Sequence, residues 1–419
     1  MNDSYAPLTP ASLPTRLAQL QVMTDRLGPS SRWTVREVGD GNLNLVFIVE
    51  GPEGSAVVKQ ALPYVRAAGE SWPLSLERAW FESQALIRLQ ARDPGRVPQL
   101  WHFDPAQALQ VMEHLRPHVI LRRQLIAQRR FPLLARQLGT FLARTLFRGS
   151  ELSLPTVERK ADLALFAGNV ELTGITEDLV FTDPYRECAR NRSNPLLADE
   201  VRRTRADAPL KQASLELKIR FCTLGESLLH GDLHTGSVMV SEDDTRVIDA
   251  EFATCGPMGF DIGALLGNLW MACFAQRSRP ASDGADGSQL NWLLDCAQQV
   301  WNSFAAEFTV LWQCERHGIL GGRELFDAQG DTVTTDRLLQ DWLVRILEDS
   351  LGYAGIEITR RILGFAHVAD FDSIADPAVR ADCERCALRA GRELAVRRRE
   401  IRTMAEATTL IAGLAASPR

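Results

Sequence analysis

The sequence has few of the features that mark membrane, secreted or nucleic-acid-binding proteins. Its 419 residues contain no continuous apolar run of about 18 residues, the length that a membrane-spanning helix needs. The polar, proline-bearing segment Met1–Pro14 has no signal-peptide pattern. A net charge of −6 argues against a basic surface for nucleic acid. We therefore expect a cytoplasmic protein that binds neither membranes nor nucleic acid.

Cysteine is not arranged for disulfides or for a metal site. The eight cysteines are scattered, and only Cys383 and Cys386 have CxxC spacing. Without a second such pair or a nearby histidine, this spacing is a weak sign of zinc or redox chemistry, which stays the less favoured alternative. We interpret the cysteines as free thiols in a reducing cytoplasm.

Lysine is scarce, with four lysines against 43 arginines. One of the four, Lys59, ends the apolar run Ser55–Lys59. An ammonium is a compact point charge, whereas a guanidinium is a planar fork, so the choice of lysine suggests a requirement for the compact charge. An edge-strand side chain that points to solvent is the other interpretation, and the segment alone does not choose between them.

The order of strand and helix patterns indicates two lobes. The chain is 45% hydrophobic and 24% charged, as in soluble globular proteins, and it is long enough for more than one core. Before residue 118 strand patterns prevail, and after it helical patterns prevail, except for a hairpin at 238–248. We predict an α+β fold with a β-rich lobe at 1–115 and a mostly helical lobe at 116–419.

The individual elements follow from apolar periodicity and turn residues. Strands are expected at 33–38, 43–49, 55–59 and 109–112. Helices are expected at 8–28, 76–92, 120–148, 158–169, 195–229, 259–277, 289–317, 336–367 and 376–412.

The β-rich lobe holds candidates for binding phosphate. The turn Gly39–Asn44 brings Asn42 and Asn44 between two strands, where amide groups can donate to phosphate oxygens. Alone this turn is a weak signal, because an ordinary hairpin has the same residues. Lys59 follows on the next strand, and Glu82 on the following helix can pair with it; Glu77 is the rival for that role.

The segment His230–Ser237, which reads His-Gly-Asp-Leu-His-Thr-Gly-Ser, is the strongest signal. Asp232 is the candidate that orients an attacking hydroxyl and accepts its proton, since an ordinary aspartate is ionised at neutral pH. His230 is interpreted as a residue that organises the loop. For His234, a loop histidine with one hydrogen bond is favoured over a catalytic role.

Two carboxylates follow the hairpin. Asp249 and Glu251 are two residues apart and share a face if the segment is extended. Hard oxygen ligands without a histidine or cysteine cluster favour Mg²⁺. The hairpin folds back on itself, so Asp232 and Asp249 are expected at one edge of one cleft.

Two features of the helical lobe have open interpretations. Asp261 either caps a helix or accepts amide hydrogen bonds from the 230–232 loop. Arg360 and Arg361 lie in a largely apolar helix, so at least one is expected to be partly buried beside an anion. One interpretation is an internal salt bridge to Glu357 or Asp370. The other, which is slightly favoured, is a clamp on the transferring phosphoryl group or on a substrate hydroxyl.

Together these segments resemble the protein-kinase-like superfamily in its small-molecule branch, which includes aminoglycoside and choline kinases. His-Gly-Asp in place of His-Arg-Asp marks that branch. More closely, Val38–Phe47, His230–Ser237, Asp249–Glu251 and the Arg360–Arg361 pair resemble the S-methyl-5-thioribose kinases of methionine salvage. The resemblance extends from about residue 8 to residue 410.

This resemblance implies a bilobal kinase fold, ATP and Mg²⁺ as cofactors, and phosphorylation of the 1-hydroxyl of methylthioribose, typically by a homodimer. It implies Asp232 as the base, Arg360 and Arg361 near the sugar, and Trp72 in a loop that closes over the nucleotide. Asp249 and Glu251 are implied as the metal ligands. The residues implied at ATP are Asn42, Asn44, Lys59, Glu82, Glu113, His114, Leu115, Asp249, Ala250 and Glu251.

Departures from the broader kinase pattern leave alternatives. Ser237 stands where the catalytic-loop asparagine usually binds a second metal, so the number of metals is open. A kinase for an aminoglycoside, choline or homoserine is the second hypothesis, although paired arginines disfavour cationic substrates. A catalytically dead nucleotide-binding scaffold is the third, and the intact Lys59, Asp232 and Asp249 argue against it.

Overall fold

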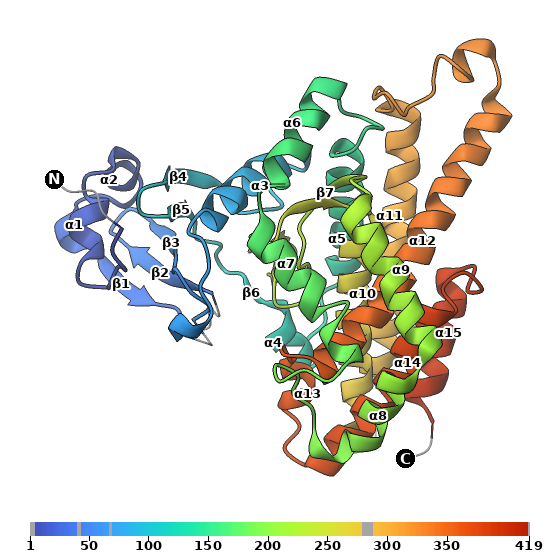
Figure 1. Cartoon of the computed structure of the whole chain (residues 1–419). Coiled ribbons are helices and arrows are strands. Elements are labelled where there is room, and N and C mark those ends of the chain that lie inside the picture. The colour runs from blue at the N-terminus through green and yellow to red at the C-terminus, as the bar shows by residue number, and fades with distance from the viewer. Residues whose placement is uncertain (1–4, 40–42, 67–68, 279–287, 418–419) are drawn as a thin grey trace.

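The computed structural model describes residues 5–39, 43–66, 69–278 and 288–417. These residues form two lobes, one built on a sheet and one mostly helical (Figure 1). The α+β, bilobal fold predicted from the sequence is confirmed. Within the described part of the chain, no helix is both long and apolar enough to cross a bilayer.

The first lobe is built on a five-stranded antiparallel sheet with the order β1-β2-β3-β5-β4. Side chains alternate between the two faces of β3, so Val58 packs toward the N-terminal helices while Lys59 points to the opposite face. The elements are α1 Leu13–Leu17, α2 Gln21–Leu27, β1 Thr34–Glu37, β2 Asn44–Glu50, β3 Ser55–Ala61, α3 Arg78–Arg92, β4 Leu100–Asp104 and β5 Leu109–Glu113.

Two expectations for this lobe were incomplete. The helix expected at 8–28 is two short helices, because Leu20 is extended with ψ 110° and interrupts the pattern. Strand β4 was not expected from the sequence. It lies at the edge of the sheet, and each of its residues is half-buried, so its side chains lack the alternation of buried and exposed positions that marks a strand.

The second lobe contains twelve α-helices in the described residues and two small sheets, β7–β10 and β6–β8–β9. Its helices are α4 Leu121–Ile126, α5 Leu134–Arg148, α6 Thr156–Phe166, α7 Val170–Leu179, α8 Ala198–Ala206, α9 Ala208–Thr223, α10 Gly259–Ala275, α11 Ser288–Cys314, α12 Thr332–Leu363, α13 Ala369–Asp372, α14 Pro377–Val396 and α15 Met404–Ala415. Its strands are β6 Val119–Ile120, β7 Ser227–Leu229, β8 Val238–Val240, β9 Thr245–Val247 and β10 Thr254–Gly256.

Three long helical expectations were wrong because each contains a break. The 120–148 segment is two helices, and Gln128, with φ 60°, lies between them. The 195–229 segment divides where Asp207 accepts a hydrogen bond from Leu210 N and Pro209 occupies the first turn of α9, and it ends in strand β7. The 376–412 segment divides into α14 and α15. Helices α7 and α13 and strands β6, β7 and β10 were not expected.

Helix α10 forms the centre of the second lobe. Every residue from Gly259 to Phe274 is buried, so this largely apolar helix needs neighbours around its whole surface. Helices α11, α12 and α14 provide them. The first turn of α10 and the C-terminal half of α12 therefore flank the loop between β7 and β8, which carries the His-Gly-Asp segment.

The crossing of α12 and α14 depends on glycine. A Cβ atom on Gly355 would overlap the carbonyl oxygen of Gly391 and lie 2.8 Å from Ala395 N. We expect Gly355→Ala to lower the free energy of unfolding by about 1–3 kcal/mol, because backbone must move to admit the methyl group.

Chemical denaturation followed by circular dichroism measures this effect. The matched control is Gly413→Ala on α15, where an added Cβ meets no atom within 4 Å. The control is expected to gain up to about 1 kcal/mol from helix propensity. Equal stability of the two variants would contradict the close helix crossing.

Candidate active site

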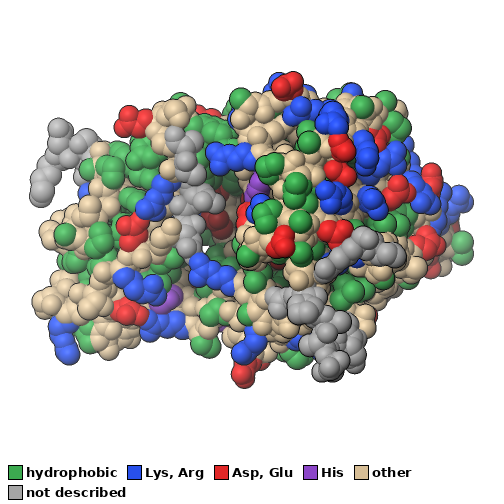
Figure 2. Space-filling view, turned by 90° about the horizontal axis from the view of Figure 1, so that it is seen from below, with side chains coloured by type: hydrophobic (Ala, Val, Ile, Leu, Met, Phe, Trp, Pro, Cys, Tyr) green, Lys and Arg blue, Asp and Glu red, His purple; other side chains and the backbone are tan. Residues whose placement is uncertain are grey.

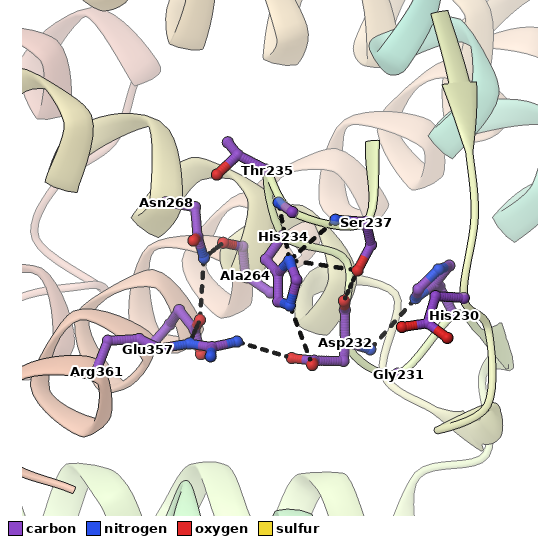
Figure 3. Close-up of polar contacts among 12 residues, drawn as sticks. His230, Gly231, Asp232, His234, Thr235, Ser237, Ala264, Asn268, Glu357 and Arg361 are labelled. Carbon is purple, nitrogen blue, oxygen red and sulfur yellow. Dashed lines mark hydrogen bonds and ion pairs between the residues drawn. The ribbon is translucent and has the colours of Figure 1, made fainter. Parts of the chain in front are cut away.

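The loop between β7 and β8 presents Asp232 between the two lobes. Gly231 precedes it with φ 87°, and a Cβ at Gly231 would overlap the Phe252 carbonyl oxygen, so this position requires glycine. His230 Nε2 donates to Ile248 O at 2.9 Å, which ties the loop to the strand end that leads to Asp249. Its Nδ1 lies 3.4 Å from the Asp232 backbone nitrogen (Figure 3), and both contacts are consistent with the loop-organising role inferred for His230.

Asp261 holds the same loop from the first turn of α10. Its buried carboxylate accepts from His230 N at 2.6 Å and from Gly231 N at 3.0 Å. The second of the two interpretations is therefore confirmed. The capping interpretation is wrong, because the N-cap position of α10 is Met258 and Asp261 lies inside the helix.

Three cationic or hydrogen-bonding side chains surround the Asp232 carboxylate. Arg360 Nη2 and Arg361 Nη2 both donate to Oδ1, at 2.8 and 3.1 Å, and His234 Nε2 lies 3.4 Å from Oδ2. Burial would raise the pKa of Asp232, but His234 and the two guanidiniums hold it well below its ordinary value. Asp232 is therefore an ionised acceptor that can orient a hydroxyl.

His234 makes more contacts than the one expected from the sequence. Its Nδ1 accepts from the backbone N–H groups of Gly236 and Ser237, both at 3.0 Å, which leaves Nε2 to face Asp232. Burial and the nearby Arg122 guanidinium lower its pKa, although Asp232 opposes them. The Ser237 hydroxyl donates to the Asp232 carbonyl at 3.2 Å, so this residue helps to close the loop.

The two arginines are both buried, and their internal partner is Glu357. Its Oε2 lies 2.5 Å from Arg360 Nε, and its Oε1 lies 2.7 Å from Arg361 Nε. Burial would raise the pKa of Glu357, but the two guanidiniums lower it to about 2. The internal salt bridge weighed from the sequence is confirmed for Glu357, whereas the contact with Asp232 was not foreseen.

On the β-rich lobe, Lys59 is the buried cation that faces the carboxylates of the site. It lies on a central strand rather than an edge, which rules out the solvent-facing interpretation, and it donates to Glu82 Oε1 at 2.8 Å and to Asp249. Burial would lower the pKa of Lys59, but the carboxylates of Asp249, Glu82 and Glu251 raise it above its ordinary value. Glu77, the rival partner, is exposed at the start of α3.

Three carboxylates meet beside Lys59. One oxygen each from Glu82, Asp249 and Glu251 lies within 4.8 Å of the others. The extended segment assumed for Asp249–Glu251 was wrong, because Asp249 has φ 71°, yet the two side chains still converge. Burial raises the pKa of Glu251 to about 7, with further contributions from Asp249 and Glu82. Such crowding of hard oxygen donors suits a divalent cation.

The remaining candidates around this cluster contact it in different ways. Asn44 Nδ2 donates to Glu251 Oε2 at 2.9 Å, so the amide lies beside the carboxylates. Ala250, which separates Asp249 from Glu251 in the sequence, is buried. Asn42 lies outside the described residues. Sequence reasoning missed Arg78, which donates to Leu43 O at 2.6 Å and lies 3.9 Å from Glu251.

The segment after β5 passes between the lobes at residues 113–115. His114 Nδ1 lies 2.9 Å from Ser55 Oγ, and Leu115 is buried. Among the described residues, the Leu115 N–H has no hydrogen-bond partner. A free backbone donor beside a buried apolar side chain can bind the edge of a planar heterocycle.

Trp72 connects the lobes on another side. It belongs to the segment between β3 and α3, and its ring lies 5.5 Å from that of Phe365, which follows α12. The Arg190 guanidinium lies 5.7 Å from the Trp72 ring. Figure 2 shows a hollow between the lobes in which acidic, basic and histidine side chains are visible.

The Cys383–Cys386 pair takes no part in this site. Both cysteines are buried on α14, and neither is in a disulfide. In the ranges that the structure describes, the only cluster of three or more His, Cys, Asp or Glu side chains that could hold a metal ion is that of Glu82, Asp249 and Glu251.

Two residues of the helical lobe complete the site and were missed from the sequence. Arg122 donates to Asn268 Oδ1 at 2.7 Å, and Asn268 Nδ2 donates to Glu357 Oε1 at 3.0 Å. Asn268 could have been found, because it is an amide inside the apolar run of α10, where a buried polar group needs partners. Arg122 had no such signal among the many arginines of the chain.

Comparison with known proteins places this geometry in a family. Residues 34–299 match the phosphotransferase enzyme family. The methylthioribose kinase of Escherichia coli O45:K1 (strain S88) is 44% identical over 412 residues, covering 96% of this chain and 98% of that protein. The chain belongs to the methylthioribose kinase family. The family, the fold class and the assignment as a small-molecule kinase expected from the sequence are thus confirmed.

Other members and neighbours are similar as well. Methylthioribose kinase 2 of Oryza sativa subsp. japonica is 41% identical over 405 residues, with 96% of this chain and 95% of that protein covered. A solved choline/ethanolamine kinase family protein from Mesorhizobium loti covers 92% of this chain and 98% of its own, at 14% identity and a TM-score of 0.41.

Removing the Asp261 carboxylate tests how the loop is held. In Asp261→Ala the buried N–H groups of His230 and Gly231 lose their acceptor, at about 1–3 kcal/mol each. We expect lower thermal stability and a large loss of turnover, measured by ADP release. Asp261→Asn keeps one oxygen acceptor and is expected to lose less. Wild-type turnover in Asp261→Ala would show that other contacts fix the loop.

Proposed function

We propose that this chain transfers the γ-phosphoryl group of ATP to the 1-hydroxyl of S-methyl-5-thioribose. The products are S-methyl-5-thioribose 1-phosphate and ADP, and the reaction belongs to methionine salvage. The observation that carries the proposal is one ionised carboxylate, Asp232, held by two arginines across from the Lys59–Asp249 pair, in a chain of this family. Phosphoryl transfer depends on positioning and on charge neutralisation, and this arrangement supplies both.

Asp232 is assigned to the sugar hydroxyl. Both arginines donate to Oδ1, so Oδ2 has only the longer contact with His234 and is the oxygen that we assign to the hydroxyl. The low pKa makes Asp232 a weak base, which fits a proton that moves late, after the bond to phosphorus has largely formed. Arg360 and Arg361 then lie where the transferring group carries its negative charge.

The opposite wall is assigned to the nucleotide. Lys59, fixed by Glu82, is placed for the α- and β-phosphates, and the backbone of residues 113–115 for adenine. Asn42 and Asn44 are assigned to phosphate oxygens and Trp72 to a lid over the nucleotide. The loop with Trp72 already touches the helical lobe at Phe365, which supports a closing role.

The acidic cluster is assigned to Mg²⁺, with Asp249 and Glu251 as the ligands. Three carboxylates with converging oxygens support this assignment, and no nitrogen or sulfur donor belongs to the group. The metal supplies neutralisation of the phosphate charge when it is bound. We further propose a cytoplasmic homodimer.

The alternatives explain fewer contacts. A polycationic aminoglycoside or choline would meet Arg360 and Arg361, which neutralise the Asp232 and Glu357 carboxylates and so leave a cation no net negative charge to bind there. Homoserine carries a carboxylate that the arginines could bind, so it remains the competing acceptor in the test. A non-catalytic scaffold would have no need for a carboxylate as tightly held as Asp232.

An ADP-release assay over a panel of acceptors tests the proposal. Methylthioribose is expected to give the highest kcat/KM among methylthioribose, homoserine, choline and an aminoglycoside. Asp232→Asn keeps the shape of the residue and is expected to lose about 10³-fold or more in kcat while ATP still binds. A higher kcat/KM for another alcohol, or wild-type turnover in Asp232→Asn, would refute the respective assignment.

Titration with Mg²⁺ tests the metal assignment. Asp249→Ala removes a proposed ligand and is expected to weaken Mg²⁺-dependent ATP binding by about tenfold or more, as measured by calorimetry. Asp243→Ala is the control, because Asp243 is exposed in the nearby hairpin turn and lies outside the acidic cluster. Unchanged binding in Asp249→Ala would contradict the metal role.

A further inference from the structure

Glu357 determines the direction in which the arginine pair points. It lies one helical turn before the pair on α12, and its two oxygens take one Nε each, at 2.5 Å from Arg360 and 2.7 Å from Arg361. The guanidinium is a rigid planar fork, so a carboxylate that holds its Nε–H also fixes the directions in which its Nη N–H groups point. Both Nη2 atoms therefore converge on Asp232 Oδ1 (Figure 3 shows the Arg361 side).

Asn268 in turn orients Glu357. Its Nδ2 donates to Glu357 Oε1 at 3.0 Å and to Ala264 O at 2.9 Å. Its Oδ1 accepts from Arg122 Nη2 at 2.7 Å, so the amide cannot be turned over without losing these contacts. The side chain of Asn268 is buried, and every polar atom of it is thus engaged.

The contacts return to the loop that carries Asp232. The Arg122 backbone N–H donates to Thr235 O at 3.0 Å, and its Nε donates to Thr235 Oγ1 at 3.0 Å. Asp370 Oδ2 lies 3.3 Å from the same Nε and balances the Arg122 charge. A continuous path therefore connects Thr235 through Arg122, Asn268 and Glu357 to the arginines and back to Asp232.

We propose that Glu357 is a positioning residue for phosphoryl transfer, and that Asn268 is the residue that orients it. This inference rests on the proposed kinase function. Glu357 and Asp232 together balance the two guanidiniums, so that the pair stays aimed at the reacting groups. A buried ion pair is weak evidence for a role in stability, because apolar packing of similar volume is often as stable.

Glu357→Gln is the decisive variant. A glutamine can accept from one Nε only, since its NH₂ group faces the other Nε–H or the Asn268 amide. We expect kcat to fall by about 100-fold from misplacement of one arginine, while the KM for ATP changes by less than about twofold. Activity is measured by ADP release on whichever alcohol the wild type phosphorylates.

The matched control is Glu384→Gln on α14. Glu384 is also a buried carboxylate beside an amide and an arginine, with Asn194 Nδ2 at 3.3 Å and Arg380 Nε at 3.9 Å. It lies outside the proposed path and is expected to keep the wild-type kcat. A general cost of removing a buried carboxylate would lower kcat in Glu384→Gln as well, whereas loss of arginine positioning is confined to Glu357→Gln.

A double variant separates positioning from folding. Asn268→Leu in the Glu357→Gln background removes both proposed members of the path. We expect the double variant to lose kcat by about as much as Glu357→Gln alone, because Asn268 acts through Glu357, whereas independent structural damage would multiply the two losses. If Glu357→Gln does not fold, Asn268→Leu is tested instead, with an expected loss of about tenfold in kcat at unchanged KM for ATP.

Several results would overturn the positioning role. They are a kcat for Glu357→Gln within about threefold of wild type, an equal loss in Glu384→Gln, or losses that simply multiply in the double variant. A different preferred acceptor would contradict the proposed substrate only, because the ratio of variant to wild type is measured on the acceptor that is used.

Discussion

The ammonium of Lys59 joins the parts on which the site depends. It bonds to Glu82 on α3 and to Asp249 after the catalytic hairpin, so one positive charge connects the sheet, its helix and the helical lobe. Around it three carboxylates converge, and without a cation their repulsion would push them apart. The alternation of side chains along β3 decides that Lys59 faces this cluster rather than the N-terminal helices.

A second cluster of ion-paired side chains lies on the helical-lobe side of the site. Four charges, on Glu357, Arg360, Arg361 and Asp232, sum to zero at the end of α12. Taking them out of water costs free energy that their attraction need not return in full. Their value lies in geometry, because salt bridges at fixed helical spacing orient two guanidiniums toward one carboxylate. The charged group therefore serves to orient side chains, whereas the stability of this region comes from the buried, largely apolar helix α10 beside it.

The sequence predicted best what local pattern controls. The two-lobe order, the His-Gly-Asp loop and the Lys59–Glu82 pair follow from strand and helix periodicity and from residue types at short spacing. The prediction failed where an apolar pattern continues across a break in the helix. The helices expected at 120–148 and 376–412 are each divided in two by a local turn of the backbone. Strand β4 was missed because an edge strand is half-buried throughout and loses the alternating pattern.

The sequence by itself determined the family, the fold class and the candidate residues of the site, since these depend on short segments with strong residue preferences. Only the tertiary structure decided which groups touch. Glu251 meets Glu82 and Asn44, and Asn268 meets Glu357 and Arg122, across separations of dozens to hundreds of residues. Such contacts depend on how α10 and α12 pack and on how the lobes meet, and no local pattern encodes that.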